Sequence, residues 1–226
     1  MKKAALHNLG CKVNAYETEA MQHLLEEAGY EIVPFTQKAD VYVINTCSVT
    51  NMADRKSRQM LHKAKKNNPD SIVVAAGCYV QTSEKEVLND LSVDIVIGND
   101  RKHDLVRLLE EYSLDSVNDT VDDINDGKHD FEELFIDQTK EHTRAFIKVQ
   151  DGCNQFCSYC IIPYARGRVR SRRFENVIAE VERLAANGFK EVVLTGIHLS
   201  SYGVDFEEAV GLLEPVSYTH LTLPTT

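Results

Sequence analysis

Short apolar runs alternate with amphipathic stretches along the first 112 residues, and this alternation restricts the folds open to the chain. Four runs have the length and composition of buried strands, and a fifth is weaker: KAALHN (3–8), DVYVIN (40–45), SIVVAA (71–76), DIVIG (94–98) and YEIVPF (30–35). Strands that alternate with helices form parallel sheets covered by helices on both faces. We therefore predict an α/β domain of the flavodoxin-like type over residues 1–112.

The stretches between the runs carry helix start signals. Asn14 is followed three residues later by Glu17, which predicts a capping box at the start of a helix that reaches about Ala28. Thr50 or Asn51 is expected to cap a second helix, which reaches about Asn67.

Residues 113–143 separate this pattern from a second one. Ten acidic residues and two lysines give the segment a charge of −8, out of −10 for the whole chain. A segment that is acidic and short of apolar periodicity typically behaves as a solvated connector, so we predict a linker between two domains. Because the acidic charge is concentrated here, the net charge does not exclude an RNA partner.

Neither a membrane span nor a secretory signal is expected. No apolar run approaches the roughly 18 residues that a membrane helix needs, and the first residues, MKKAALHNLGCKVN, lack the apolar core of a signal peptide. We therefore expect a cytoplasmic protein without a membrane partner. We also expect a monomer. The six cysteines are not expected to form disulfides, which are uncommon in the cytosol.

Three of these cysteines follow predicted strands. Cys11 follows LHNLG, Cys47 follows VYVINT and Cys78 follows IVVAAG. The carboxyl ends of parallel strands share one edge of a sheet, where such sheets bind ligands, so we predict a shared metal or cluster site. Gly10 and Gly77 would let the backbone turn sharply beside it. The alternative is three buried cysteines that pack as small apolar residues.

A second unit begins at residue 144. It consists of the strand RAFIKVQ (144–150), a cysteine-rich loop, the helix ENVIAEVERLAANG (175–188) and the strand EVVLTG (191–196). The loop spaces Cys153, Cys157 and Cys160 as C-x3-C-x2-C. Structural zinc prefers four ligands, and the loop contains no histidine. Three thiolates on a four-iron cluster leave one iron open to a substrate, which favours catalysis over electron transfer.

This loop and four other motifs resemble the radical S-adenosylmethionine (SAM) methylthiotransferases. The motifs are NLGCKVNAYETE, VINTCSVTNMADRKSRQ, AAGCYVQ, DGCNQFCSYCIIPYARGRVRSR and LTGIHLSSYG. They are most similar to the branch that methylthiolates C2 of N6-threonylcarbamoyladenosine next to the tRNA anticodon. Enzymes of this branch belong to the sulfurtransferase class. The branches that act on isopentenyladenosine in tRNA or on a ribosomal protein are alternatives.

The resemblance implies two [4Fe-4S] clusters, SAM and an electron donor. Cys153, Cys157 and Cys160 would hold the cluster at which SAM is cleaved to a 5′-deoxyadenosyl radical. Cys11, Cys47 and Cys78 would hold an auxiliary cluster that carries the sulfur, and a second SAM would supply the methyl group. Tyr159 is expected near the SAM adenine, with Thr195 and Gly196 near its methionine part.

Five arginines follow the cysteine loop and suggest contact with RNA: Arg166, Arg168, Arg170, Arg172 and Arg173. Alternation would place the first four on one face of an extended segment. There they would neutralise phosphates of a tRNA whose unpaired anticodon-loop bases are read. The alternative is a solvated basic segment that pairs with the acidic residues 113–143. His198 lies in a family motif and is expected to pack rather than react.

The chain departs from the family after its first barrel unit. The family continues with a partial (β/α) barrel of about six units and an RNA-binding domain, so residues 144–208 are expected to be the start of a truncated radical SAM domain in an inactive amino-terminal fragment. Residues 216–226, VSYTHLTLPTT, match nothing in the family and resemble a translated sequencing adapter, whereas residues 209–215 stay undecided. Two other hypotheses are an iron–sulfur or zinc protein without radical chemistry and an RNA-interaction module with packed cysteines.

Overall fold

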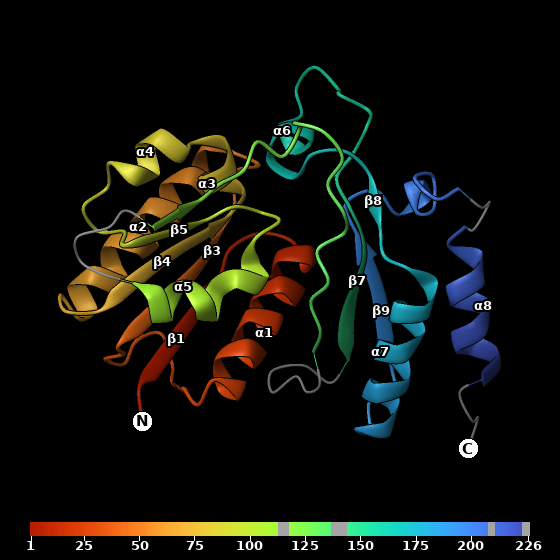
Figure 1. Cartoon of the computed structure of the whole chain (residues 1–226), viewed down its shortest axis with the longest axis horizontal. Coiled ribbons are helices and arrows are strands. Elements are labelled where there is room, and N and C mark those ends of the chain that lie inside the picture. The colour runs from red at the N-terminus through yellow and green to blue at the C-terminus, as the bar shows by residue number, and fades with distance from the viewer. Residues whose placement is uncertain (113–117, 137–143, 208–210, 223–226) are drawn as a thin grey trace.

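The computed structural model describes residues 1–112, 118–136, 144–207 and 211–222 (Figure 1). Two sheets lie side by side in it, and helix α1 (Lys12–Glu27) runs between them. Residues of α1 pack against both sheets, which makes this helix the shared element of the molecule.

The larger sheet is fully parallel and has the order β2-β1-β3-β4-β5-β6. Its strands are β1 Lys3–Asn8, β2 Glu31–Ile32, β3 Val41–Thr46, β4 Ile72–Gly77, β5 Ile95–Ile97 and β6 Asn118–Thr120. The order of the first five is that of the flavodoxin-like fold, so the predicted fold class is confirmed. All six residues of β3 are buried, as expected for a central strand that is covered on both faces.

Helices cover the two faces of this sheet. On one face, α2 (Asn51–Asn67), α3 (Cys78–Thr82) and α4 (Glu84–Leu88) pack on side chains such as Tyr42 and Ile44. On the other, α1 and α5 (Leu105–Glu111), which follows the short helix η1 (Lys102–Asp104), pack on Val41 and Val43. The alternation along β3 therefore places successive side chains in different cores.

Of the two predicted helix caps, the structure contains one and lacks the other. Thr50 caps α2 as predicted, because its hydroxyl accepts a hydrogen bond from the Ala53 amide at 3.1 Å. The capping box at Asn14 is wrong, because α1 begins at Lys12 and Asn14 lies inside its first turn. The Asn14 side-chain amide donates instead to the carbonyls of Leu9 and Thr46, each at 2.9 Å, and so ties the helix to the strand ends.

Residues 118–136 differ from the solvated connector that their charge predicted. β6 extends the large sheet by pairing in parallel with β5. Ile124, Leu134 and Ile136 are buried, and the last two join α1 and the second sheet in one core. These three apolar side chains and the pairing of β6 with β5 attach the segment to the fold, although acidic residues surround them.

The second unit has the predicted βαβ form. β7 (Ala145–Asp151) pairs in parallel with β9 (Val192–Gly196), and α7 (Phe174–Ala186) packs on them through Val177, Val181 and Leu184. A two-residue strand, β8 (Arg170–Ser171), pairs antiparallel with the other edge of β7. The short helices are α6 (Ile162–Arg166) and η2 (Leu199–Ser201).

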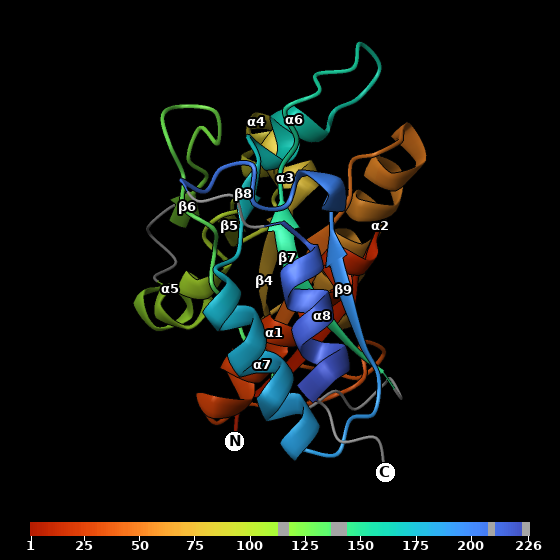
Figure 2. The same cartoon turned by 90° about the vertical axis from the view of Figure 1, so that its right-hand side faces the viewer.

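The last described helix, α8 (Leu213–Thr222), lies beside α7 (Figure 2). It includes part of residues 216–226, whose non-native origin stays a prediction. None of the helices in the described part of the chain is long and apolar enough to cross a membrane.

Candidate functional site

The cysteines of the first domain lie at one edge of the large sheet. Cys47 and Cys78 directly follow Thr46 and Gly77, which are register partners on β3 and β4. The amide of Leu9 donates to the carbonyl of Asn45 at 3.0 Å, which brings the segment leading to Cys11 alongside. The strand register therefore places all three cysteines at the same edge, as predicted from their sequence positions.

Two glycines shape the backbone next to these cysteines. Gly10 and Gly77 have φ values of 113° and 97°, in the region that favours glycine, as the sequence suggested. A Cβ atom on Gly10 would lie 3.0 Å from the Cys47 sulfur, so only glycine permits the turn at Cys11 to approach so closely. Cys47 and Cys78 are buried, whereas Cys11 is exposed.

The second cysteine triad occupies a loop at the end of β7. Cys153 and Cys160 are partly buried and Cys157 is exposed. The loop is closed by hydrogen bonds from the Cys153 amide to the Gly167 carbonyl, 3.0 Å, and from the Cys160 amide to the Cys157 carbonyl, 2.9 Å. The Arg168 guanidinium stacks on the Phe156 ring with 4.3 Å to its centroid. The backbone therefore presents three thiols within one compact loop.

Arg166 connects this loop to the first triad. It ends α6, which begins just after Cys160, and its side chain is fully buried. Its Nη2 atom donates to Asn14 Oδ1 at 2.7 Å, and the Cys11 thiol donates to the same oxygen at 3.5 Å. On the other side, the side-chain amide of Asn99 lies 3.6 Å from the Cys78 sulfur and donates to the Ala165 carbonyl at 2.5 Å.

Two buried carboxylates balance the charge of Arg166. Its Nη1 atom lies 3.0 Å from Glu17 and 2.9 Å from Asp151. Lys148 lies 3.0 Å from Glu17 and 3.3 Å from Asp151, and Lys102 lies 3.4 Å from Glu17. We call these five side chains the Arg166 network.

The Arg166 network keeps the Glu17 carboxylate charged inside the protein. Burial opposes ionisation of Glu17, but Arg166 and the two lysines more than offset this effect and hold its pKa well below the usual range. Burial raises the pKa of the Cys78 thiol, and the Arg166 charge opposes part of that rise.

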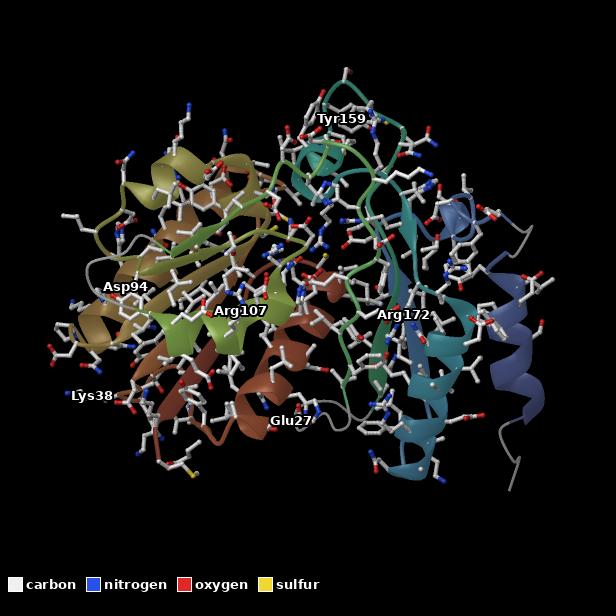
Figure 3. All side chains as sticks on the ribbon, in the orientation of Figure 1. Glu27, Lys38, Asp94, Arg107, Tyr159 and Arg172 are labelled. Carbon is white, nitrogen blue, oxygen red and sulfur yellow. The ribbon has the colours of Figure 1, made fainter. Side chains whose placement is uncertain are left out.

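The residues expected near SAM are only partly brought together. Thr195 and Gly196 end β9, and Gly196 is the register partner of Gln150 on β7. Gln150 was not recognised from the sequence, yet its amide donates to the Asp151 and Gly152 carbonyls and its Oε1 atom accepts from the His198 amide at 2.7 Å. Tyr159 is 91% exposed at the tip of its loop (Figure 3), so it does not pack against Thr195 or Gly196.

The arginines do not form the expected common face. Arg166, Arg170 and Arg172 are buried, and only Arg168 and Arg173 are exposed. The prediction fails because the segment is not extended: α6 ends at Arg166, Gly167 turns with a φ of 70°, and β8 begins at Arg170. Buried Arg166 and Arg172 are enclosed by protein and cannot meet phosphate in this structure.

Arg172 pairs with the acidic segment, as the alternative supposed, but it is buried rather than solvated. It forms an ion pair with Glu133 of the acidic segment at 2.8 Å and another with Glu180 of α7. Burial raises the pKa of Glu180, and the charge of Arg172 opposes that rise. His198 is partly buried, with its Nδ1 atom 2.6 Å from the Ser201 hydroxyl, and its role in packing rather than reaction stays a prediction.

The donor chemistry of both triads fits iron–sulfur clusters. Within the described ranges, no three His, Cys, Asp or Glu side chains already surround a point where a metal ion could sit. Each triad nevertheless supplies three thiols, the ligand type of such clusters. The missing Cβ at Gly10 lets the segment before Cys11 approach the Cys47 sulfur closely, which brings two members of the first triad near one another.

Known proteins match the chain over most of its length. Residues 3–98 match the uncharacterized protein family UPF0004, and residues 147–223 match the Radical SAM superfamily. The chain is 47% identical over 210 residues to the threonylcarbamoyladenosine tRNA methylthiotransferase MtaB of Bacillus subtilis, covering 92% of this chain and 46% of that protein. The MtaB of Aquifex aeolicus is 46% identical over 205 residues, with coverages of 90% and 50%.

A relative with a different named substrate is less similar. The tRNA-2-methylthio-N(6)-dimethylallyladenosine synthase of Thermoanaerobacter sp. is 35% identical over 213 residues, covering 91% of this chain and 44% of that protein. The chain thus spans about half the length of the curated relatives that it matches.

A solved structure shares the fold. The radical SAM methyltransferase TsrM of Kitasatospora setae, with tryptophan and a SAM analogue bound, has a TM-score of 0.57 at 15% identity and covers 88% of this chain and 48% of its own. The same protein with cobalamin and a [4Fe-4S] cluster has a TM-score of 0.56. This likeness extends over both sheets and concerns the fold alone.

Proposed function

We propose that this chain, whose residues 3–98 match the UPF0004 family and whose residues 147–223 match the Radical SAM superfamily, is part of a radical SAM methylthiotransferase that modifies tRNA. The proposed reaction adds a methylthio group to C2 of N6-threonylcarbamoyladenosine next to the anticodon. The observation that carries the choice of substrate is the identity of 46–47% to two enzymes named for this nucleoside, against 35% to one named for the dimethylallyl nucleoside.

The two cysteine triads are the proposed cluster ligands. Cys153, Cys157 and Cys160 would hold one [4Fe-4S] cluster together with SAM, and Cys11, Cys47 and Cys78 would hold the other. When bound, these cofactors supply the radical and sulfur chemistry. The chain itself positions the two triads: Arg166 binds Asn14 from the side of the loop, while Gln150 fixes the turn where the loop leaves β7.

The partners are proposals of the same kind. An electron donor would reduce the clusters, and the tRNA anticodon loop would approach the exposed Arg168 and Arg173 rather than the whole arginine series. Charged side chains on the surface contact phosphate backbones without reading sequence. We also propose that the protein works in the cytoplasm.

Nucleoside analysis tests the function. Deletion of the full-length gene should remove 2-methylthio-N6-threonylcarbamoyladenosine from total tRNA, leave N6-threonylcarbamoyladenosine in its place, and spare the methylthiolated dimethylallyl nucleoside. Mass spectrometry of digested tRNA distinguishes these species. The wild-type gene should restore the product, whereas the Cys47→Ala gene should not. Loss of the dimethylallyl product instead would reassign the substrate, and an unchanged tRNA profile would refute the proposal.

A further inference from the structure

A cavity of about 400 Å³ lies between residues 124–130 of the acidic segment and the start of β8. Its lining includes the residues Lys128, Arg168 and Arg170 together with Asp130 and Asp205. We call this cavity the Arg170 pocket. It contains none of the six cysteines, so it is separate from the site described above.

Arg170 is the unusual member of the lining. Only 5% of the residue is exposed, and one of its terminal nitrogens, Nη2, donates to the Arg166 carbonyl at 2.9 Å. Its Nε and Nη1 atoms have no hydrogen-bond partner within residues 1–112, 118–136, 144–207 and 211–222. Buried donors without acceptors are rare in native proteins, because leaving one unpaired costs about 1–3 kcal/mol and more for a charged group.

The neighbouring acids are already engaged elsewhere. Asp205 accepts a hydrogen bond from the Ser171 amide at 2.8 Å. Asp151, the register partner of Arg170, accepts from Arg166, from Lys148 and from the Gly152 amide. These carboxylates lower the local potential but leave two guanidinium nitrogens of Arg170 unpaired.

The charge of the pocket favours an anion. Lys128, Arg168 and Arg170 contribute three positive charges against the two negative charges of Asp130 and Asp205, so the lining has a balance of +1 although the adjoining segment 113–143 is strongly acidic. His129 also lines the cavity, but its ring is bound by Asp100 at 2.8 Å and by two backbone carbonyls. Lys128 and Arg168 are exposed, so the pocket is reached from the surface.

We propose that the Arg170 pocket binds a phosphate group. Phosphate oxygens would supply the acceptors that Nε and Nη1 lack, and hydrogen bonds between a guanidinium and an ionised oxygen are about twice as strong as neutral ones. Lys128 and Arg168 would contribute positive charge at the mouth. The phosphate belongs either to an RNA backbone, a source that rests on the proposed function, or to free phosphate, and both sources share the same contacts.

Inorganic phosphate tests the pocket without reference to RNA. We expect phosphate to raise the melting temperature of the chain relative to chloride at equal ionic strength, because a ligand that binds only the folded state stabilises it. Phosphate affinity, measured from the concentration dependence of that shift, should fall at least tenfold in Arg170→Gln and about threefold in Lys128→Gln. Matched controls are Arg107→Gln and Lys85→Gln, which remove the same charges from helices α5 and α4, away from the pocket.

RNA distinguishes the two sources. If the phosphate belongs to RNA, binding of a tRNA anticodon stem-loop should weaken in Arg170→Gln and Lys128→Gln, and the salt dependence should lose roughly one unit of slope per lost contact. Loss of phosphate binding with unchanged RNA binding would assign the pocket to free phosphate and would leave the proposed function intact.

Two results would overturn the inference. The first is a phosphate effect in the wild type that does not exceed that of chloride, and the second is an equal effect in the wild type and in Lys128→Gln. Lys128 is exposed, so this variant should fold and decides the matter if Arg170→Gln does not.

Discussion

Arg166 shows how one side chain can serve two distant parts of the chain. It contacts Asn14 and Glu17 from α1 and Asp151 from β7, and it is fully buried. The sequence suggested Arg166 as a phosphate contact because it stands in an arginine-rich series, and sequence spacing alone cannot show that a helix ends there and turns the side chain inward. The cysteines, in contrast, were placed correctly at the sheet edge because strand ends follow directly from apolar patterning.

Removing Arg166 should strongly destabilise the protein. Arg166→Met leaves Glu17 and Asp151 with only the two lysines in a buried setting, and loss of one partner from a buried ion-pair network costs about 3–5 kcal/mol. Urea unfolding followed by circular dichroism measures the change. Arg168→Met is the matched control, since exposed Arg168 should alter the unfolding free energy by no more than about 0.5 kcal/mol. Equal effects of the two substitutions would contradict the role of the Arg166 network.

The cysteine triads should load metal independently. Anaerobic reconstitution of the chain should give about eight irons, and Cys47→Ala should retain about four, because the triad in the loop is complete without Cys47. Iron and sulfide analysis with electron paramagnetic resonance provides the measurement. Cys153→Ala is the reciprocal variant and should lose the other half. Stoichiometric zinc in place of iron would show that the triads are not cluster ligands.

At the level of elements, the acidic segment is where composition and structure diverge most. Its predicted behaviour as a connector rested on charge, whereas its position in the fold depends on Ile124, Leu134 and Ile136 and on ion pairs with basic residues. Helices α1, α2 and α7 and strands such as β3 and β7 were predicted to within a few residues, because their apolar periodicity is strong, whereas the short helices α3 to α6 and strand β8 were not predicted. A segment held by three separate apolar contacts has no such periodicity.

His103 makes the attachment of this segment depend on pH. Its hydrogen bond with Glu132, 3.2 Å between Nδ1 and Oε1, raises the pKa of the imidazole above the ordinary value of 6.5. A raised pKa in the folded state means that the stabilisation is fully present below pH 6.5 and is lost as pH rises through the folded pKa. The effect should stay below about 1 kcal/mol, because half of the ring is exposed.

The matching experiment compares the wild type with His103→Gln. Their difference in unfolding free energy should be larger at pH 5.5 than at pH 8.5. His62→Gln is the control: His62 pairs with a different carboxylate, that of Asp90, and lies on α2, away from the acidic segment. A difference that is independent of pH would refute the assignment.

At the scale of the whole molecule, the two sheets are joined by a common core. Tyr16 and Ala20 of α1 lie in the same cluster as Ile147, Val149 and Val177 of the second unit. The sequence predicted two domains separated by a linker. It could not show that one face of α1 packs against the second unit, which lies more than a hundred residues further along the chain.

This shared core predicts cooperative unfolding. Ile147→Ala removes a fully buried side chain and should lower the unfolding free energy by about 2–5 kcal/mol. Because α1 belongs to both sheets, amide hydrogen exchange should accelerate in β3 as well as in β7. Faster exchange confined to β7 and β9 would show that the second unit opens alone. Ile72→Ala, at the partly buried start of β4, serves as the comparison in the large sheet.

The double contact of α1 also bears on the order in which the protein assembles. The Tyr16 hydroxyl bonds to the Leu134 carbonyl across 118 residues, and Asn14 meets Arg166 across 152. Contacts of such long sequence separation form slowly, because a long loop must close before they stabilise anything. During synthesis on the ribosome, α1 can settle on its own sheet long before its second face has a partner. The two cysteine triads therefore become fixed relative to one another only in the last stage of folding.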